Sequence, residues 1–262
     1  MPFKIDITTF SDYNLRKYEL SCYNIDAEIA SKSEIDKLKY ANETFFRKVI
    51  RLLLGHPRYR GEFYFHESSL RFDPRVYDKT VGYFDGYWQT ERYFADFKEE
   101  IRKQFKISRP LHSATLRLLT DILEKNSVGI HVRRGDYVHN RHTNAMHGTC
   151  PLQYYQKAVS FILEQQDNCH LFVFTDDIPW VKRNMRLSDR QVIVELPEEV
   201  PDYEAMYLMS QCRHNIIANS SFSWWGAWLN KNPRKIVVAP RRWFRSNDMD
   251  AKDIIPNEWI RL

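Results

Sequence analysis

The feature that most constrains the fold is an alternation of two patterns in the second half of the chain. Short apolar runs rich in β-branched residues recur there, at 128–132, 171–174, 192–196, 216–218 and 235–239. Between them, apolar residues follow helical spacing at 151–166, 203–212 and 223–230. Short buried strands alternating with helices predict an α/β fold, in which a parallel sheet is covered by helices on both faces.

The first half is less regular, and it predicts a separate lobe. Helical spacing there predicts three helices, at 34–54, 93–105 and 111–125. The aromatic and glycine-containing stretch 57–88 predicts loops and short strands. The segment Ser108-Arg109-Pro110 is the expected boundary, which divides the chain into domains 1–108 and 109–262; a boundary just before Val128 is the alternative.

Composition excludes several classes of protein. Aromatic residues make up 15% of the 262 residues, which excludes a disordered chain, and 8 Gly exclude a collagen-like one. No apolar run approaches the ~18 residues of a membrane span, so we expect no integral membrane segment. The start carries no signal-peptide pattern, and the four scattered cysteines read as reduced thiols. We therefore expect a cytoplasmic protein; peripheral membrane association through a basic face stays open.

Polar side chains follow three of the predicted strands at the points where they end. The first strand is followed by Arg133, Arg134, Asp136 and Tyr137, the second by Asp176 and Asp177, and the fourth by Asn219, Ser220, Ser221 and Ser223. Ligands of open parallel sheets bind beyond the carboxyl ends of the strands. Guanidinium groups can grip phosphate, and the start of a helix favours an anion. The pattern therefore predicts a nucleotide site.

Structural alternatives remain open for these residues. A serine of the cluster could simply cap the following helix, and an aspartate before Ile178-Pro179 could do the same. The other aspartate is then the candidate for recognition of a base. His131 lies on the same strand face as Arg133, either as a core histidine or facing a ligand.

Three other patterns have plainer interpretations. His139, His142 and His147 are too loosely spaced to predict a zinc site, so no metal is expected there. The tryptophans at 224, 225 and 228 are expected to pack in the core. The basic stretch 231–245, with Trp243 and Phe244, could bind RNA, but a solvated basic face is the simpler interpretation.

Three motifs in this order resemble those of the α-1,2-fucosyltransferases, the glycosyltransferase family 11 enzymes. The segment His131-Val132-Arg133-Arg134-Gly135-Asp136-Tyr137 resembles their H-x-R-R-G-D-Y motif. Phe174-Thr175-Asp176-Asp177 resembles the second motif, and 219–229 the bacterial form of the third. The tail 253–259 is also similar to bacterial members. The resemblance covers nearly the whole chain.

The resemblance implies a GT-B fold of two Rossmann-like lobes and a metal-independent, inverting reaction. It implies GDP-fucose as the donor substrate, a terminal β-galactoside as the acceptor, and no cofactor, no metal and no nucleic-acid partner. By the resemblance Arg133 would hold the β-phosphate beside Ser221. His131 and Asp177 (or Asp176) would read the guanine, with Arg134 and Tyr137 nearby.

The chemistry of such a transfer agrees with these residues. A departing nucleoside diphosphate needs positive charge, which Arg133 and a helix start would supply. The acceptor hydroxyl loses a proton, and Asp136 is the candidate base, with orientation of Arg134 as the alternative role.

One departure from the family pattern concerns the start of the chain. Family members normally open with an apolar strand and a glycine-rich turn, which this sequence does not contain. A missing β-α unit of about 30 residues would leave the first lobe incomplete. The alternative function is therefore a catalytically impaired nucleotide-sugar or glycan-binding remnant of the family.

Overall fold

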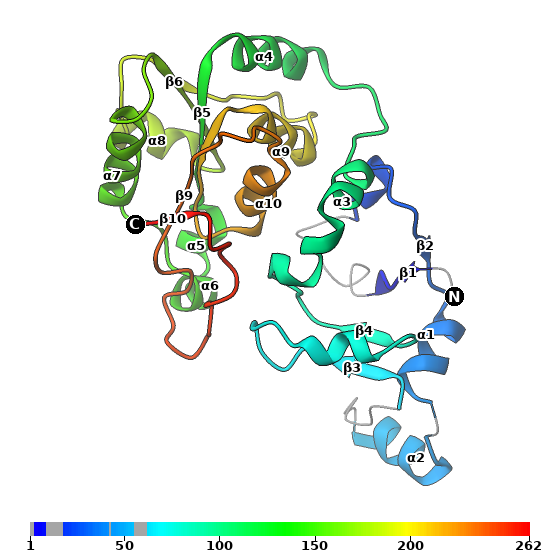
Figure 1. Ribbon diagram of the computed structural model, residues 1–262. Helices are drawn as coiled ribbons and strands as arrows, with labels where there is room; N and C mark the ends of the chain where they lie inside the picture. Colours follow the sequence, from blue (N-terminus) through cyan, green and yellow to red (C-terminus); the bar gives the residue numbers. More distant parts are fainter. Residues whose placement is uncertain (1–2, 9–17, 42, 55–61) are drawn as a thin grey trace. The chain divides into compact units, whose positions relative to one another are not determined.

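The computed structural model describes residues 3–8, 18–41, 43–54 and 62–262. The chain divides into two compact units, Met1–Arg109 and Pro110–Leu262. Figure 1 shows their elements coloured along the sequence.

The second unit is built on a six-stranded sheet in which every strand pair is parallel. The strand order is β10-β9-β8-β5-β6-β7. The strands are β5 (Asn126–Val132), β6 (Cys169–Thr175), β7 (Gln191–Ile193), β8 (His214–Ile216), β9 (Val237–Ala239) and β10 (Ile260–Arg261). The parallel α/β sheet predicted from the sequence is confirmed.

Helices cover both faces of this sheet. They are α4 (Ser113–Glu124), α5 (Gly135–His139), α6 (Arg141–Met146), α7 (Leu152–Leu163), α8 (Ile178–Asn184), α9 (Asp202–Gln211) and α10 (Ser221–Leu229). Figure 1 shows α7 and α8 on one side of the sheet and α4, α9 and α10 on the other. The predicted helices at 151–166, 203–212 and 223–230 are confirmed as α7, α9 and α10, with ends that differ by one to three residues.

The alternation of side chains along β5 explains how the two faces are filled. Val128, Ile130 and Val132 are buried in one apolar cluster with the inner face of α7. The residues between them point to the other face, where a side chain on Gly129 would meet Cys212 Sγ at 3.0 Å. Because successive residues of a strand point to opposite faces, His131 lies on the same face as Gly129. This alternation places His131 on the side of α9 and α10.

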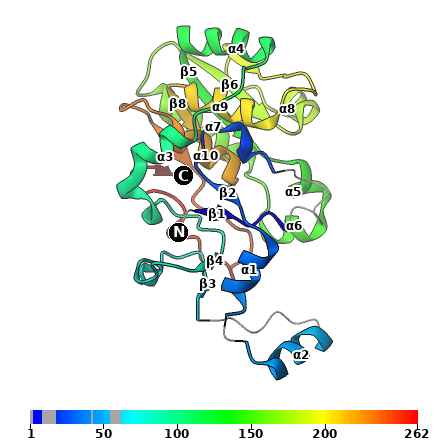
Figure 2. The same ribbon diagram turned by 90° about the vertical axis from the view of Figure 1, so that its right-hand side faces the viewer.

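The first unit contains two small parallel sheets. β1 (Lys4–Ile5) pairs with β2 (Glu28–Ile29), and β3 (Tyr64–His66) pairs with β4 (Tyr83–Asp85). Its helices are α1 (Lys32–Lys39), α2 (Phe45–Leu54) and α3 (Lys98–Gln104), with 3₁₀ turns at Leu20–Cys22, Pro74–Asp78, Glu91–Tyr93 and Ala95–Phe97. Figure 2 shows the paired strands β3 and β4 with α1 beside them.

Two predictions in this unit were wrong. The predicted helix 34–54 is two helices, because Tyr40 leaves the helical conformation (φ −120°, ψ 24°) and α2 starts only after Thr44. Asparagine and threonine, which lie at 42 and 44, favour helix starts over helix interiors. The predicted helix 93–105 begins only at Lys98, because Phe94 (φ −142°) separates two 3₁₀ turns from each other and Phe97 (φ −109°) separates the second turn from α3. Of the predicted loop region, residues 57–61 lie outside the described residues.

Three predicted strands also differ in extent. The strand predicted at 192–196 ends at Ile193, and the one predicted at 216–218 is shifted back to β8. The strand predicted at 235–239 begins only at Val237. Among the described residues, no helix has both the length and the apolar character needed to cross a membrane.

Candidate functional site

A cavity of about 350 Å³ opens beyond the carboxyl ends of β5, β6 and β7. Its walls come from these strand ends, from the loop after β7 and from the first turns of α9 and α10. The residues that carry its chemistry are His131, Arg133, Thr175, Asp176, Glu198, Asp202 and Phe222. Parallel strands end at one edge of a sheet, so residues distant in sequence meet here.

Arg133 is the central cation of this cavity. Its Nη2 donates to Asp136 Oδ1 at 2.6 Å, and its Nη1 lies 2.9 Å from Asp176 Oδ2. The side chain is 23% exposed, so the pairs are only partly screened by water. Two carboxylates hold the guanidinium in one orientation, and its planar fork keeps further N–H groups for a ligand.

Arg134 pairs with Asp177 and not with Asp136. Its Nε donates to Asp177 Oδ2 at 3.0 Å, and its guanidinium lies 3.9 Å from the ring centroid of Trp180. Asp136 therefore does not orient Arg134, and that alternative was wrong: the partner of Asp136 is Arg133. Arg133 and Asp136 lie three residues apart at the start of a helix, and this spacing brings their side chains within contact distance.

Asp177 is the N-cap of α8, as the capping alternative stated. Its Oδ1 accepts from the backbone N–H of Trp180 at 3.0 Å, and its Oδ2 accepts from Arg134. Burial acts to raise the pKa of this carboxyl, but the hydrogen bonds from Arg134 and Trp180 outweigh it and lower the pKa. Asp177 therefore stays ionised and holds α8 to the end of β5.

Gly135 explains why the two strand ends can approach so closely. A Cβ at this position would lie 2.6 Å from Asp176 Oδ2, a separation that a real side chain does not adopt. Asp176 also accepts the backbone N–H of Arg134 at 2.8 Å through its Oδ1. The glycine of the Arg-Arg-Gly-Asp segment is therefore needed for the contact between β5 and β6.

His131 is buried yet lines the cavity. It is 4% exposed, and its ring centroid lies 5.0 Å from that of Phe222. Within the part of the chain that the structure describes, its Nδ1 has no hydrogen-bond partner. Burial, with a smaller contribution from the charge of Arg133, lowers the pKa of His131 to about 3. The imidazole is therefore neutral at physiological pH, with one ring nitrogen able to accept and the other to donate.

The start of α10 borders the same cavity through Phe222. Ser220 occupies the N-cap position, but its side chain makes no capping hydrogen bond. The alternative in which one of these serines only caps the helix is therefore not what the structure shows. Ser221 is exposed at the first helical position, so the first N–H groups of a nine-residue helix are open to an anion.

Three other predicted site residues hold the framework. Asn219 is 3% exposed, and its Nδ2 donates to the carbonyls of His147, Gly148 and Trp243 at 3.0, 3.2 and 3.0 Å. Tyr137 donates through its hydroxyl to the carbonyl of Asn219 at 3.1 Å.

Ser223 is the third of these framework residues. It is fully buried and donates to the carbonyls of Ala218 and Ser220. Asn219, Tyr137 and Ser223 therefore fix the loop that leads into α10.

The structure also decides the remaining alternatives. Trp243 and Phe244 are 4% and 6% exposed, so they offer no surface on which RNA bases could stack. Trp224 and Trp228 are buried, as expected for core residues. Cys22, Cys150, Cys169 and Cys212 are all free, as expected for reduced thiols. Over the described ranges, no group of three or more His, Cys, Asp and Glu side chains has the arrangement to hold a metal ion.

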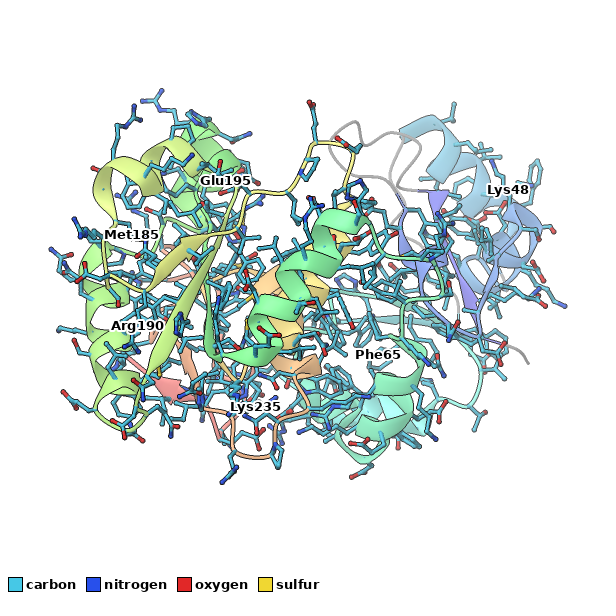
Figure 3. The ribbon with its side chains drawn as sticks, turned by 90° about the horizontal axis from the view of Figure 1, so that it is seen from above. Lys48, Phe65, Met185, Arg190, Glu195 and Lys235 are labelled. Carbon is cyan, nitrogen blue, oxygen red and sulfur yellow. The ribbon has the colours of Figure 1, made fainter. Side chains whose placement is uncertain are left out.

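The third wall of the cavity was not predicted from the sequence. It comes from the segment after β7, which contributes Val194, Leu196, Pro197, Glu198, Val200 and Pro201. Figure 3 labels Arg190 before β7 and Glu195 after it. The segment carries no polar motif of the kind found at the other strand ends. The segment could have been found from its place in the sequence, because it directly follows a predicted strand. The carboxyl ends of all strands in a parallel sheet lie at the same edge.

Comparison with known proteins gives a consistent result. The model of the family "Glycosyl transferase family 11" matches residues 26–262. An alpha-1,2-colitosyltransferase from Escherichia coli is 33% identical over 99% of this chain and 88% of its own length. The O-antigen biosynthesis glycosyltransferase WbnK, also from Escherichia coli, is 33% identical over 94% of this chain and 84% of its own.

Two more distant similarities are also found. The human galactoside alpha-(1,2)-fucosyltransferase 1 is 24% identical over 52% of this chain and 40% of its own. A structure of NodZ alpha-1,6-fucosyltransferase soaked with GDP-fucose is 17% identical, with a TM-score of 0.34 over 53% of this chain and 48% of that one. The family model spans most of the chain, including all three motifs at the cavity, and the chain therefore belongs to glycosyl transferase family 11.

Proposed function

We propose that this glycosyltransferase is a galactoside α-1,2-fucosyltransferase. It transfers L-fucose from GDP-fucose to the 2-hydroxyl of a terminal β-galactoside, with inversion at the fucose carbon and without a metal. One observation carries the proposal: the guanidinium of Arg133, held by two carboxylates, lines a cavity that the open start of α10 also borders.

In this proposal Arg133 and the start of α10 bind the diphosphate. The guanidinium carries a full positive charge, and the first turn of a helix adds backbone N–H groups with a partial one. Negative charge grows on the β-phosphate as the bond to fucose breaks. Groups that are already fixed in place stabilise that charge without reorganising. This stabilisation is expected to supply most of the rate enhancement. Ser221 lies at the first turn and is the side chain proposed to assist.

His131 is the residue proposed to read the guanine. A neutral imidazole, buried against Phe222 and with an unpartnered Nδ1 in the described part of the chain, is suited to one directional hydrogen bond. Asp176 and Asp177, the other two candidates, each already use both carboxylate oxygens for partners within the protein. We therefore assign them to holding Arg133 and Arg134, rather than to direct contact with the base.

Asp136 is the residue proposed to accept the proton of the acceptor hydroxyl. Its Oδ1 is bonded to Arg133, and its side chain is 37% exposed, so the carboxylate is accessible from solvent. In this proposal residues 109–262 form the donor lobe of a GT-B enzyme, and residues 1–108 form the acceptor-side lobe.

A second candidate is transfer of colitose in place of fucose. It is favoured by the relative named alpha-1,2-colitosyltransferase, which is 33% identical over 99% of this chain. The phosphate and base contacts proposed above would serve either donor. The two candidates differ only in the part of the site that contacts the sugar.

The test is a transfer assay with lactose as the acceptor and EDTA present. GDP-fucose and GDP-colitose are supplied separately, and the product linkage is read by NMR. An α-1,2-linked product from GDP-fucose supports the proposal, and a product from GDP-colitose alone favours the second candidate. Binding of GDP-fucose without transfer to lactose or to longer β-galactosides indicates the impaired remnant. Absence of both binding and transfer contradicts the proposal.

A further inference from the structure

Helix α2 in the first unit has two chemically distinct sides. Its ten residues are Phe-Phe-Arg-Lys-Val-Ile-Arg-Leu-Leu-Leu. At 100° per residue, the seven apolar positions of Phe45–Leu54 fall on one continuous arc, and the three basic positions, 47, 48 and 51, fall on the other. A helix of a globular protein normally buries such an apolar arc against the core.

The apolar side of α2 is instead exposed. Phe45 is 82% exposed, Phe46 73% and Leu53 79%, while Leu52 and Ile50 are 65% and 39% exposed. Single exposed apolar residues are common, but five on one ten-residue helix form a continuous patch. Such a patch indicates a surface that is covered by another molecule in use.

The charge around this patch indicates what covers it. Helix α2 contains three basic residues and no acidic one: Arg47, Lys48 and Arg51. Lys48, labelled in Figure 3, is exposed on α2. A helix with one apolar arc and only basic residues at its other positions matches a surface whose interior is hydrocarbon and whose face is negatively charged. A protein partner with an apolar groove would not by itself account for the basic residues.

We propose that α2 is a membrane-surface anchor that lies in the interface of an anionic lipid bilayer. Phe45, Phe46 and Leu53 enter the boundary between headgroups and acyl chains, and the basic side faces the lipid phosphates. With ten residues the helix is too short to span a bilayer, so it lies along the surface. A short helix of this kind gives reversible attachment that depends on both apolar burial and charge.

The test is co-sedimentation of the full chain with lipid vesicles. Vesicles of phosphatidylcholine alone are compared with vesicles containing about one third phosphatidylglycerol, at low and high salt. The wild-type chain is expected to pellet with the anionic vesicles at low salt, and much less with the neutral ones. The pair Phe46→Glu/Leu53→Glu is expected to lower the partition coefficient at least about tenfold, because it puts two charges on the apolar arc.

The matched control is Leu116→Glu/Leu123→Glu on α4, which has the same seven-residue spacing on exposed positions (49% and 55%). It is expected to bind anionic vesicles like wild type. Equal loss in the control, or no loss in the α2 pair, would overturn the proposal. A second pair, Lys48→Glu/Arg51→Glu, leaves the apolar arc intact and is expected to remove the preference for anionic lipid. If the Phe46→Glu/Leu53→Glu variant does not fold, this second variant still tests whether α2 binds anionic lipid.

Sedimentation velocity separates this proposal from self-association. If the wild-type chain is a dimer that Phe46→Glu/Leu53→Glu dissolves, and neither form binds vesicles, then a second copy covers α2 and the proposal is wrong. A monomer that binds anionic vesicles through α2 is the expected result.

Discussion

Arg133 illustrates how a few side chains decide the chemistry of this cavity. Its two ion pairs, at 2.6 and 2.9 Å, come from carboxylates on two different segments, the first turn of α5 and the end of β6. A bidentate fork can satisfy both and still face the cavity, whereas an ammonium group is a single point charge. The identity of this residue as arginine, rather than its charge alone, is therefore expected to matter.

The substitution Arg133→Lys should reduce transfer by about 10²–10³-fold, the usual effect of removing one preorganised donor to a developing anion. The affinity for GDP should fall more than the affinity for GMP, because the proposed contact is to the β-phosphate. Arg186→Lys, at an exposed pair with Asp189, is the matched control and should leave both affinities unchanged. Equal losses for GDP and GMP, measured by titration calorimetry, would argue against the phosphate role.

His131 predicts a pH dependence of stability. Its folded pKa of about 3 lies below the unfolded value of 6.5, so the unfolded chain binds more protons between these two values. The free energy of unfolding therefore falls as the pH drops from 6.5 toward 3. Between pH 7.5 and pH 5, wild type should lose about 2 kcal/mol more than His131→Gln, which cannot titrate. Urea unfolding at the two pH values measures this difference, and parallel losses in both proteins would refute it.

At the scale of elements, the sequence predicted which segments of the second unit form strands, because their apolar, β-branched runs are a local signal, but it did not predict where three of these strands begin or end. The cavity wall at 194–201 was missed because nothing local distinguishes that loop. The partners of Asp176 and Asp177 were also beyond prediction. Their pairing with Arg133 and Arg134 depends on how β5 and β6 meet in space, not on spacing along the chain. The break between α1 and α2 was overlooked because the apolar stripe continues through it.

The junction of β5 and α5 predicts a strong effect from a single methyl group. Gly135→Ala places Cβ 2.6 Å from Asp176 Oδ2 and should displace that carboxylate from Arg133. We expect a loss of about 1–3 kcal/mol in stability and at least about tenfold in GDP affinity. Gly86→Ala is the matched control, because its Cβ would lie 2.5 Å from Glu67 Cβ in the other unit. It should cost stability but leave GDP binding intact; GDP binding that Gly135→Ala leaves unchanged would contradict this account.

The start of α10 predicts effects of opposite sign on stability and on binding. Ser221→Asp puts a carboxylate at the first helical turn, which should stabilise the fold by about 0.3–1 kcal/mol. The same charge should repel the diphosphate and lower GDP affinity at least about tenfold. Ser113→Asp makes the matching change at the first position of α4 and should raise stability alone. Thermal unfolding with and without GDP measures both effects, and a Ser221→Asp protein that binds GDP normally would exclude this helix start from the site.

At the scale of the whole molecule, the two units contain the residues for two different proposed roles, donor binding and membrane attachment. The second unit holds the cavity, the three motifs and the paired arginines, and the first holds the exposed helix α2. The motifs that resemble the family lie at strand ends, where some of their residues line the cavity and others hold the framework around it. The first unit lacks such motifs, so its elements were predicted less well from local patterns.

The most direct test of the central claim is calorimetric titration of the full chain with GDP-fucose, GDP-mannose and UDP-galactose, with EDTA in each experiment. We predict saturable binding of GDP-fucose at one site, weaker binding of GDP-mannose and none of UDP-galactose. The same titration with Arg133→Lys should show a large loss of GDP-fucose affinity. Binding of UDP-galactose as tight as that of GDP-fucose, or GDP-fucose binding that is unchanged in Arg133→Lys, would contradict the assignment of the cavity as a guanosine-diphosphate-sugar site.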